Sequence, residues 1–319
     1  MPTKPHIPDT PDFAPEWEQP VRYIERTHRW YQALGYDAPY RYAHYRDVPF
    51  TKLPSPLHSL RLALLTTAAP FREDCGDQSV RAPYNAAAKF FEVYSRDSNV
   101  DHDLRIAHVG VDRDNLHDDP NLWFPLPALR RALARGQIGS IARRFHGVPT
   151  NRSQRHTIDI DLPEVLRRLR EDGAQAVVLV ANCPICHQTL SLAARHLEAN
   201  GIATVIMGCA RDIVEYVGVP RLMFSDFPLG AACALPFDPE SQDETLSLAL
   251  QVLESAPGPR TTVQNPLRWT GPPEWRLGYM NPDRLSPEQL AQRRLAHEQA
   301  RAVAADLRQP SLPARNPPD

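Results

Sequence analysis

The sequence predicts an α/β fold, a doubly wound and mostly parallel sheet flanked by helices, with irregular N- and C-terminal extensions. The chain has 319 residues, of which 42% are apolar, enough for a sizeable core. In its central part, short and nearly continuous apolar runs alternate with helical patterns, as in parallel strands covered on both faces. Its 33 prolines concentrate at the two ends, where they oppose regular structure.

The N-terminal extension is predicted to span residues 1–57 and to contain one helix. Residues 20–34 place apolar and aromatic side chains on one face, and Gly35 follows as a stop signal. Residues 36–56 are aromatic and interrupted by proline. We therefore expect this stretch to pack as an irregular cover.

The α/β domain is predicted to span residues 58–257. Apolar runs predict buried strands at residues 60–67, 104–111, 175–182, 203–207 and 221–224. Periodicity and stop signals predict helices at residues 125–135, 161–173, 186–199, 212–217 and 238–256, the second opened by a capping box from Asp161 to Glu164. Residues 138–145 fit either a short strand or a helix.

The C-terminal segment, residues 258–319, is polar and rich in proline. Ser286 and Gln289 form a second capping box, with proline at the first helical position. The helix that follows has few large apolar residues, so it packs either on the core or on another subunit. We expect a homo-oligomer.

Charge and hydropathy exclude several classes of protein. The net charge of −2 gives no bulk attraction to nucleic acid or anionic lipid. No apolar run approaches the ~20 residues of a membrane span, and the N-terminus lacks the apolar core of a signal peptide. A cytoplasmic location is therefore expected, where a CxxC motif indicates redox or metal chemistry more than a structural disulfide.

The cysteines are the main functional signal. Cys183 and Cys186 open a helix directly after the strand at residues 175–182. The positive end of a helix favours an ionised sulfur. We therefore predict Cys183 as the nucleophile, Cys186 as the resolving thiol and His187 as a proton donor or acceptor.

The other three cysteines are predicted to be accessory residues of the same site. Cys209 and Cys233 follow the next two strands, and Cys75 lies in the loop after the first. In an open parallel sheet, ligands bind beyond the carboxyl ends of the strands. All five cysteines would thus gather at one edge, whose substrate-binding candidates are Asp112, Arg155, Arg211 and Asp226.

Two alternatives stay open. The first is a cofactor-independent racemase or isomerase in which Cys183 and Cys209 act on opposite faces of a substrate. The second is a non-catalytic zinc or iron–sulfur protein with Cys183, Cys186, Cys209 and Cys233 as ligands, or His187 in place of one. The G-x-G-x-x-G, G-x-x-x-x-G-K-[ST] and G-x-S-x-G motifs are absent, which argues against a nucleotide site and a serine hydrolase.

Three stretches carry a resemblance to a known family. They are residues 172–186, which include the CxxC, residues 208–213 (Gly-Cys-Ala-Arg-Asp-Ile) and residues 224–230 (Phe-Ser-Asp-Phe-Pro-Leu-Gly). From about residue 60 to residue 269, the chain resembles the selenoprotein B family of the glycine, sarcosine, betaine and D-proline reductases. The family resemblance implies reductive cleavage of a C–N bond, with a pyruvoyl group on a partner subunit holding the substrate.

The resemblance also assigns roles. Cys183 matches the family's selenocysteine and Cys186 its cysteine, so sulfur replaces selenium here; no pyruvoyl-forming segment is visible. We therefore predict a thiol-dependent reductase that acts on a small organic substrate, through cleavage of a C–N or other C–heteroatom bond. It would need no resident cofactor and would be restored by an external thiol or a thioredoxin-like donor.

Overall fold

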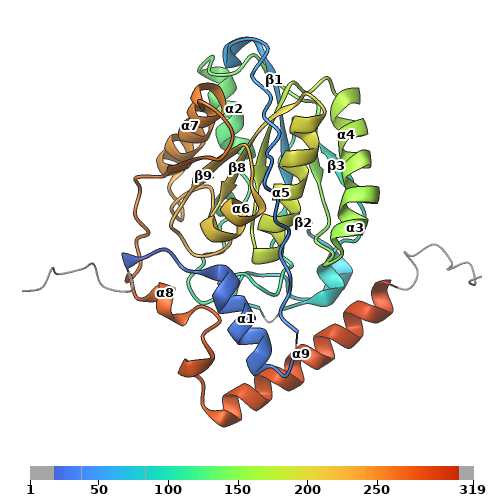
Figure 1. Ribbon diagram of the computed structural model, residues 1–319, viewed down its shortest axis with the longest axis vertical. Coiled ribbons are helices and arrows are strands. Elements are labelled where there is room, and N and C mark those ends of the chain that lie inside the picture. Colours follow the sequence, from blue (N-terminus) through green and yellow to red (C-terminus); the bar gives the residue numbers. More distant parts are fainter. Residues whose placement is uncertain (1–17, 37, 83, 309–319) are drawn as a thin grey trace, which may run out of the picture.

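A computed structural model describes residues 18–36, 38–82 and 84–308, so the ends of both predicted extensions, 1–17 and 309–319, lie outside the described residues. Figure 1 shows a central sheet with helices packed around it. The strand order is β10-β9-β8-β7-β1-β6-β3, and β5 also pairs with β1. All these pairings are parallel except the one between β3 and β6. The predicted fold class is confirmed.

The strands of this sheet are short, and those in its middle are fully buried. Every residue of β7 and β8 is buried because helices cover both faces. The bounds are β1 Arg61–Thr66, β3 Tyr94–Asp97, β5 Ser140–Ile141, β6 Arg144–Gly147, β7 Ala176–Val180, β8 Ala203–Gly208, β9 Arg221–Phe224 and β10 Thr261–Gln264. A separate two-stranded sheet pairs β2, Ala69–Pro70, with β4, Leu104–Arg105.

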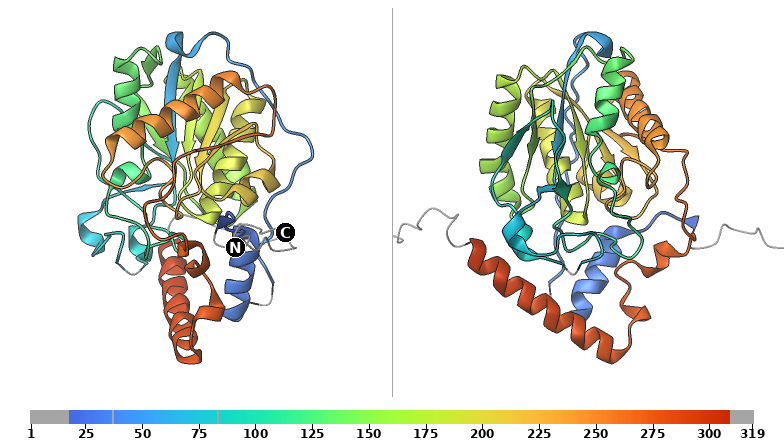
Figure 2. Two further views of the ribbon diagram at one scale, coloured as in Figure 1. Left: turned by 90° about the vertical axis from the view of Figure 1, so that its left-hand side faces the viewer. Right: turned by 180° about the vertical axis from the view of Figure 1, so that it is seen from behind.

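Helices form a layer on each side of the sheet. In Figure 2, α4, α5 and α6 lie over one face, and α2 and α7 lie over the other. The helices are α1 Tyr23–Ala33, α2 Leu126–Ala134, α3 Gln154–His156, α4 Leu162–Glu171, α5 Pro184–Ala199, α6 Arg211–Val217, α7 Pro239–Ser255, α8 Trp275–Gly278 and α9 Pro287–Arg308. Figure 1 places α1 and α9 below the carboxyl ends of the strands. None of the described helices is long and apolar enough to cross a bilayer.

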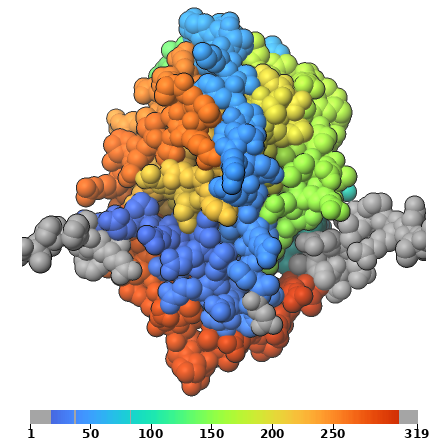
Figure 3. Space-filling model, in the orientation of Figure 1, coloured from blue at the N-terminus to red at the C-terminus, as the bar shows by residue number. Residues whose placement is uncertain are grey.

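The N-terminal cover behaves as predicted. In Figure 3 the blue stretch that leads from α1 to β1 runs as a strip over the outside of the helical layer. Two buried arginines anchor it. The Arg195 guanidinium lies 3.9 Å from the ring centroid of Tyr45, and Arg221 lies 4.1 Å from that of Phe50. The strip therefore belongs to the fold although it has no regular structure.

The prediction of a core strand at residues 104–111 is wrong. Only β4 forms there, outside the main sheet, and the chain continues as a loop. Ile106 and Val111 are nevertheless buried in the apolar core. The apolar run reflects this burial, which periodicity alone does not distinguish from a strand.

The capping box predicted at Asp161 is also wrong, whereas the one at Ser286 is confirmed. Asp161 has helical backbone angles, and its side chain makes no capping hydrogen bond. Helical structure begins earlier, where the Ser153 side chain accepts a hydrogen bond from the backbone N–H of His156. At the second box, the Ser286 hydroxyl accepts from the backbone N–H of Gln289, and the Gln289 side chain accepts from that of Ser286. The capping-box spacing is present at both positions, so spacing alone does not distinguish a helix start from a helix interior.

Two strands escaped prediction because they lie at the sheet edges and are polar. β3 reads Tyr-Ser-Arg-Asp and β10 reads Thr-Thr-Val-Gln, and neither is fully buried. A half-exposed edge strand lacks the apolar run that marks a central one. β10 also lies beyond the predicted domain boundary at residue 257, so that boundary leaves out one strand of the sheet. Residues 138–145, left open between strand and helix, contain β5 and begin β6.

Candidate active site

The turn from β7 into α5 brings the two sulfurs of the CxxC together. Cys183 is the N-cap of α5, with extended backbone angles of φ −131° and ψ 171°, and its Sγ accepts a hydrogen bond of 3.2 Å from the backbone N–H of Cys186. The two Sγ atoms are 2.6 Å apart. A helix start favours a cap side chain that accepts from its free N–H groups. The predicted proximity of the two thiols is thus present.

Cys183 lines a cavity of about 470 Å³ at the carboxyl edge of the sheet. Its side chain is 5% exposed, whereas Cys186 behind it is 0% exposed. Gly110 also lines this cavity, and a Cβ there would lie 2.7 Å from Cδ of Pro184. Only glycine lets the loop approach the start of α5 so closely. The cavity therefore reaches one sulfur of the pair directly.

His108 completes this cluster and was not predicted. One of its ring nitrogens lies within 4.8 Å of both sulfurs, and its buried Nδ1 has no hydrogen-bond partner among the described residues. The residue lies in the loop that was mistaken for a strand. A single histidine within an apolar run is a weak indication of a functional site. No spacing rule links it to a CxxC that begins 75 positions later in the sequence.

The two thiols differ in their environment. Burial and the neighbouring Cys186 raise the pKa of Cys183 well above its usual range. Burial alone would raise the pKa of Cys186 too, but hydrogen bonds from the Cys183 thiol, His108 and Thr67 outweigh it and hold that pKa well below its usual range. Two sulfurs 2.6 Å apart therefore favour one shared proton, and the directions of the two pKa shifts place it toward Cys183, whereas the helix start predicted an ionised Cys183.

The role predicted for His187 needs correction. Its ring is completely buried, with Nδ1 2.7 Å from the carbonyl oxygen of Cys183. Its Nε2 accepts hydrogen bonds from the backbone N–H groups of Cys209 and Ala210. Both nitrogens are thus engaged with backbone, so the ring positions the two cysteine-bearing turns and has no nitrogen left to transfer a proton.

The remaining cysteines lie apart from the pair. Cys209 and Cys233 are buried beyond β8 and β9, and burial raises the pKa of both. Neither lines the cavity, and neither joins the group of close ligand atoms formed by His108 and the CxxC. Cys75 packs in a small separate cluster with Ala88, its thiol 3.4 Å from the carbonyl oxygen of Ala87. The predicted gathering of five cysteines is therefore wrong, because Cys209 and Cys233 are packed in the core and Cys75 lies in a separate cluster.

These positions bear on both alternatives. A two-cysteine racemase needs two thiols that face one ligand, whereas Cys209 does not line the cavity. The predicted four-cysteine metal set does not come together either. Among the described residues, the ligand atoms that lie within 4.8 Å of one another belong to His108, Cys183 and Cys186.

None of the four predicted substrate-binding residues lines the cavity. Asp112 is buried against Asn115, and burial raises its pKa to about 6. Arg211 pairs with Glu215 on the surface, Asp226 pairs with a partly buried arginine, and Arg155 is exposed. The cavity is instead lined by Arg152, three positions before Arg155 in the sequence.

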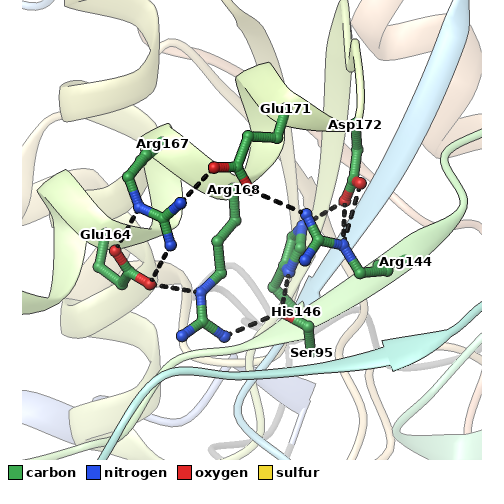
Figure 4. A network of polar contacts seen from close by, with 8 residues as sticks. All are labelled: Ser95, Arg144, His146, Glu164, Arg167, Arg168, Glu171 and Asp172. Atoms are coloured by element: carbon green, nitrogen blue, oxygen red, sulfur yellow. Dashed lines mark hydrogen bonds and ion pairs between the residues drawn. The ribbon is translucent and has the colours of Figure 1, made fainter.

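A second polar cluster lies at the sheet edge (Figure 4). Ser95 of β3 contacts Nδ1 of His146 at 2.9 Å, and Nε2 of His146 lies 3.1 Å from Asp172 after α4. The order of contacts resembles a serine–histidine–aspartate triad. However, Arg168 also donates to the Ser95 hydroxyl, and Arg144 donates to Asp172. With His146 fully buried, the network fastens the edge strand β3 and its neighbour β6 to α4.

Comparison with known proteins points to one group of enzymes. The chain is 29% identical over 188 residues to the D-proline reductase subunit gamma of Acetoanaerobium sticklandii, covering 58% of this chain and 77% of that subunit. Two relatives come from Peptoclostridium acidaminophilum. The sarcosine reductase complex component B subunit beta is 24% identical over 169 residues, and the glycine reductase complex component B subunit gamma is 23% identical over 181 residues.

The resemblance to the selenoprotein B family is confirmed. The matches cover 52% and 55% of this chain but only 38% and 40% of the sarcosine and glycine reductase subunits. No family model matches the chain, and no solved structure does. All three relatives are subunits of reductases, which supports a reductase-type role for this chain.

Proposed function

We propose that this selenoprotein B homologue is a thiol-dependent reductase that cleaves a C–N or other C–heteroatom bond of a small organic molecule. The observation that carries the proposal is the pair of sulfurs 2.6 Å apart, one of which lines a cavity of about 470 Å³. A pair this close can deliver two electrons as it becomes a disulfide. The reductases among its relatives support the same chemistry.

The first step uses the shared proton. As the sulfur of Cys183 attacks the substrate carbon, its proton moves to the Cys186 thiolate. The bond from that carbon to the heteroatom breaks, the heteroatom leaves with the bonding electrons, and a thioether forms on Cys183. Because Cys183 is the sulfur that lines the cavity, it is the one that reaches the carbon.

The second step releases the product. Cys186 gives its proton to His108, one of whose ring nitrogens lies within 4.8 Å of both sulfurs, and attacks the sulfur of Cys183, so that the S–S bond forms and the C–S bond breaks. The carbon leaves with the electron pair and takes the proton from His108. The carbon gains two electrons and a hydrogen, and the two thiols are oxidised to a disulfide. A carbonyl next to this carbon would stabilise its negative charge.

A further reductant must restore the dithiol, and an external thiol or a thioredoxin-like protein fits this role. The relatives are subunits of larger reductases, which supports a partner subunit for this chain as well. We retain the expectation that the chain itself needs no resident cofactor.

The replacement of Cys186 by Ser tests the proposal. We would incubate reduced protein with D-proline, sarcosine, glycine and a panel of α-substituted ketones, and measure intact mass and thiol consumption. Cys186→Ser lacks the thiolate that takes the proton in the first step, so it should form the covalent adduct more slowly than the wild type reacts. It should then accumulate this adduct, which peptide mapping places on Cys183, whereas the wild type turns over. Cys75→Ser is the control and should behave as the wild type does.

A second measurement makes the test independent of the substrate panel. Oxidised glutathione should convert the wild-type pair into an intrachain disulfide between Cys183 and Cys186, identified by peptide mapping. If oxidation instead leaves both cysteines as separate glutathione adducts, the pair is not a redox couple and the proposal fails.

One observation favours a second candidate function, a soft-metal site. Two sulfurs and one imidazole within 4.8 Å of one another form a three-ligand donor set, with the cavity beside Cys183 as an open position. Elemental analysis of the purified protein decides this. One equivalent of zinc or iron that is lost in His108→Gln would support it, and a metal-free protein would exclude it.

A further inference from the structure

The side chains that line the cavity are positively charged at several positions, and the proposed cysteine chemistry does not involve these charges. Three cationic side chains line the cavity, Lys89, Arg152 and Arg301, and none of the lining residues that the structure describes is an aspartate or a glutamate. The chain as a whole has a net charge of −2, so this positive surface is a local feature. A cavity lined by one sign of charge attracts ligands of the other sign.

Arg152 and Arg301 contribute positive charge to the cavity, and both are exposed to a ligand that enters it. Arg152 donates to the hydroxyl of Tyr31 at 2.7 Å, which uses one of the five N–H donors of a guanidinium. Burial, together with the charges of Arg152 and Arg301, lowers the pKa of His297, which also lines the cavity. Both arginines are exposed, so they lie at the opening. A guanidinium there can bind a carboxylate through paired hydrogen bonds.

Aromatic rings form the rest of the wall. Five of the ten tyrosines of the chain line the cavity: Tyr31, Tyr36, Tyr40, Tyr42 and Tyr84. Several are packed edge to face, including Tyr31 on Tyr36 and Tyr40 on Tyr42. Flat, rigid surfaces of this kind favour a planar ligand that can stack or meet a ring edge.

The size of the cavity exceeds what a small amino acid requires. At about 470 Å³ it falls within the range of roughly 300–1,000 Å³ typical of sites for drug-sized ligands. Its covering residues come from the segment around α1 and from α9, outside the stretch of residues 60–269 on which the family resemblance was recognised. These covering segments therefore give the site a character of its own.

We infer that the cavity binds a planar organic anion, an aryl or heteroaryl compound with a carboxylate or similar group, larger than the free amino acids named for its relatives. The anionic group lies against Arg152 and Arg301 at the opening, the planar part lies along the tyrosines, and the far end reaches Cys183. That this ligand is the substrate rests on the proposed function. Its binding does not.

Calorimetric titration of the reduced protein without an electron donor tests the inference. The probes are indole-3-acetate, its neutral analogue indole-3-acetamide, its cationic analogue tryptamine, and the small carboxylates acetate and D-proline. Indole-3-acetate should bind at least tenfold more tightly than each of the others, because only it combines the charge with the ring.

Variants locate the site. Arg152→Gln should weaken indole-3-acetate binding about tenfold and leave indole-3-acetamide unchanged, as expected for the loss of a charged hydrogen bond. Arg301→Gln is a second variant in case the first disturbs Tyr31. Arg155→Gln, three positions from Arg152 and outside the cavity, is the matched control and should bind as the wild type does.

Three results would overturn the inference: equal affinities for the acid and the amide, acetate or D-proline binding as tightly as indole-3-acetate, or both arginine variants binding as the wild type does. The proposed function fails separately, because binding consumes no electrons. A protein that binds the probe but forms no Cys183–Cys186 disulfide would retain the anion site and lose the reductase role.

Discussion

The buried imidazole of His187 gives a prediction whose size follows from the structure. Its Nε2 accepts hydrogen bonds from two backbone N–H groups, at 2.9 Å and 3.0 Å, and burial lowers its pKa to about 4. Replacement by Gln should leave at least one buried N–H without a partner. Such a group costs about 1–3 kcal/mol, so His187→Gln should lower the free energy of unfolding at pH 7 by about 1–3 kcal/mol.

The pH dependence of this cost has a definite sign. In the unfolded chain the imidazole titrates near its usual ~6.5, whereas in the folded protein it titrates near 4. Between these values the unfolded state binds more protons, so the stability that neutral His187 contributes is complete above about pH 6.5 and falls as the pH decreases. From pH 7 to pH 5 the loss is about 2 kcal/mol. His187→Gln has no such titration, so its cost should be smaller by about that amount at pH 5.

Urea denaturation of the wild type and the variant at the two pH values measures this difference. The comparison matters because other groups titrate in the same range. His146, with a pKa of about 4, has the same sign, whereas Asp112 and Asp212, with pKa values raised to about 6, have the opposite one. These terms cancel between protein and variant. His58→Gln, at an exposed position, is the control. An equal cost of His187→Gln at both pH values would refute the reasoning.

Three further predictions concern other parts of the molecule. His108→Asn removes a hydrogen bond to the Cys186 thiolate and should slow alkylation of the pair by iodoacetamide at pH 7 about tenfold; peptide mapping of the labelled cysteines measures the rate, and an unchanged rate contradicts the assignment. Glu198→Ala leaves the buried Arg221 without its ionic partner and should lower the free energy of unfolding, measured by urea denaturation, by about 3–5 kcal/mol. Arg211→Ala breaks the exposed pair with Glu215 and should lower it by less than about 1 kcal/mol. Equal losses for the two variants would contradict the role of burial. Gly208→Ala places a Cβ 2.8 Å from Nε2 of the buried His187 and should lower the free energy of unfolding by about 1–3 kcal/mol. In the control Gly258→Ala, the added Cβ meets nothing within 4 Å. Equal melting temperatures for the two variants and the wild type would contradict this close approach.

The fold could be predicted because its signals are local. The strands β7, β8 and β9 are mostly apolar, and each of the first two leads into a helix within a few residues. The CxxC at the start of α5 followed from the same reading, since a strand that ends and a helix that begins are visible in adjacent residues. The edge strands β3 and β10 were missed because half-exposed strands lack this pattern.

The site could be predicted only in part, because most of it is not local. Nothing near His108 in the sequence indicates that its ring lies beside two sulfurs. The sequence gives no means of distinguishing Arg152 from Arg155 as a ligand-binding residue. Only the folded structure shows that Arg152, and not Arg155, lines the cavity. Likewise Cys209 follows a strand as Cys183 does, yet it is packed inside the core.

The sequence by itself determined the alternation of strands and helices and the place of one cysteine pair at a helix start, since both depend on residues within a few positions of one another. Tertiary structure alone decided the rest. Which thiol faces a ligand, which histidine stands beside it and which cations surround it depend on segments brought together from α1, from the loops after β4 and β6, and from α9. Contacts at such separations are fixed by the packing of the whole molecule, and no local pattern encodes them.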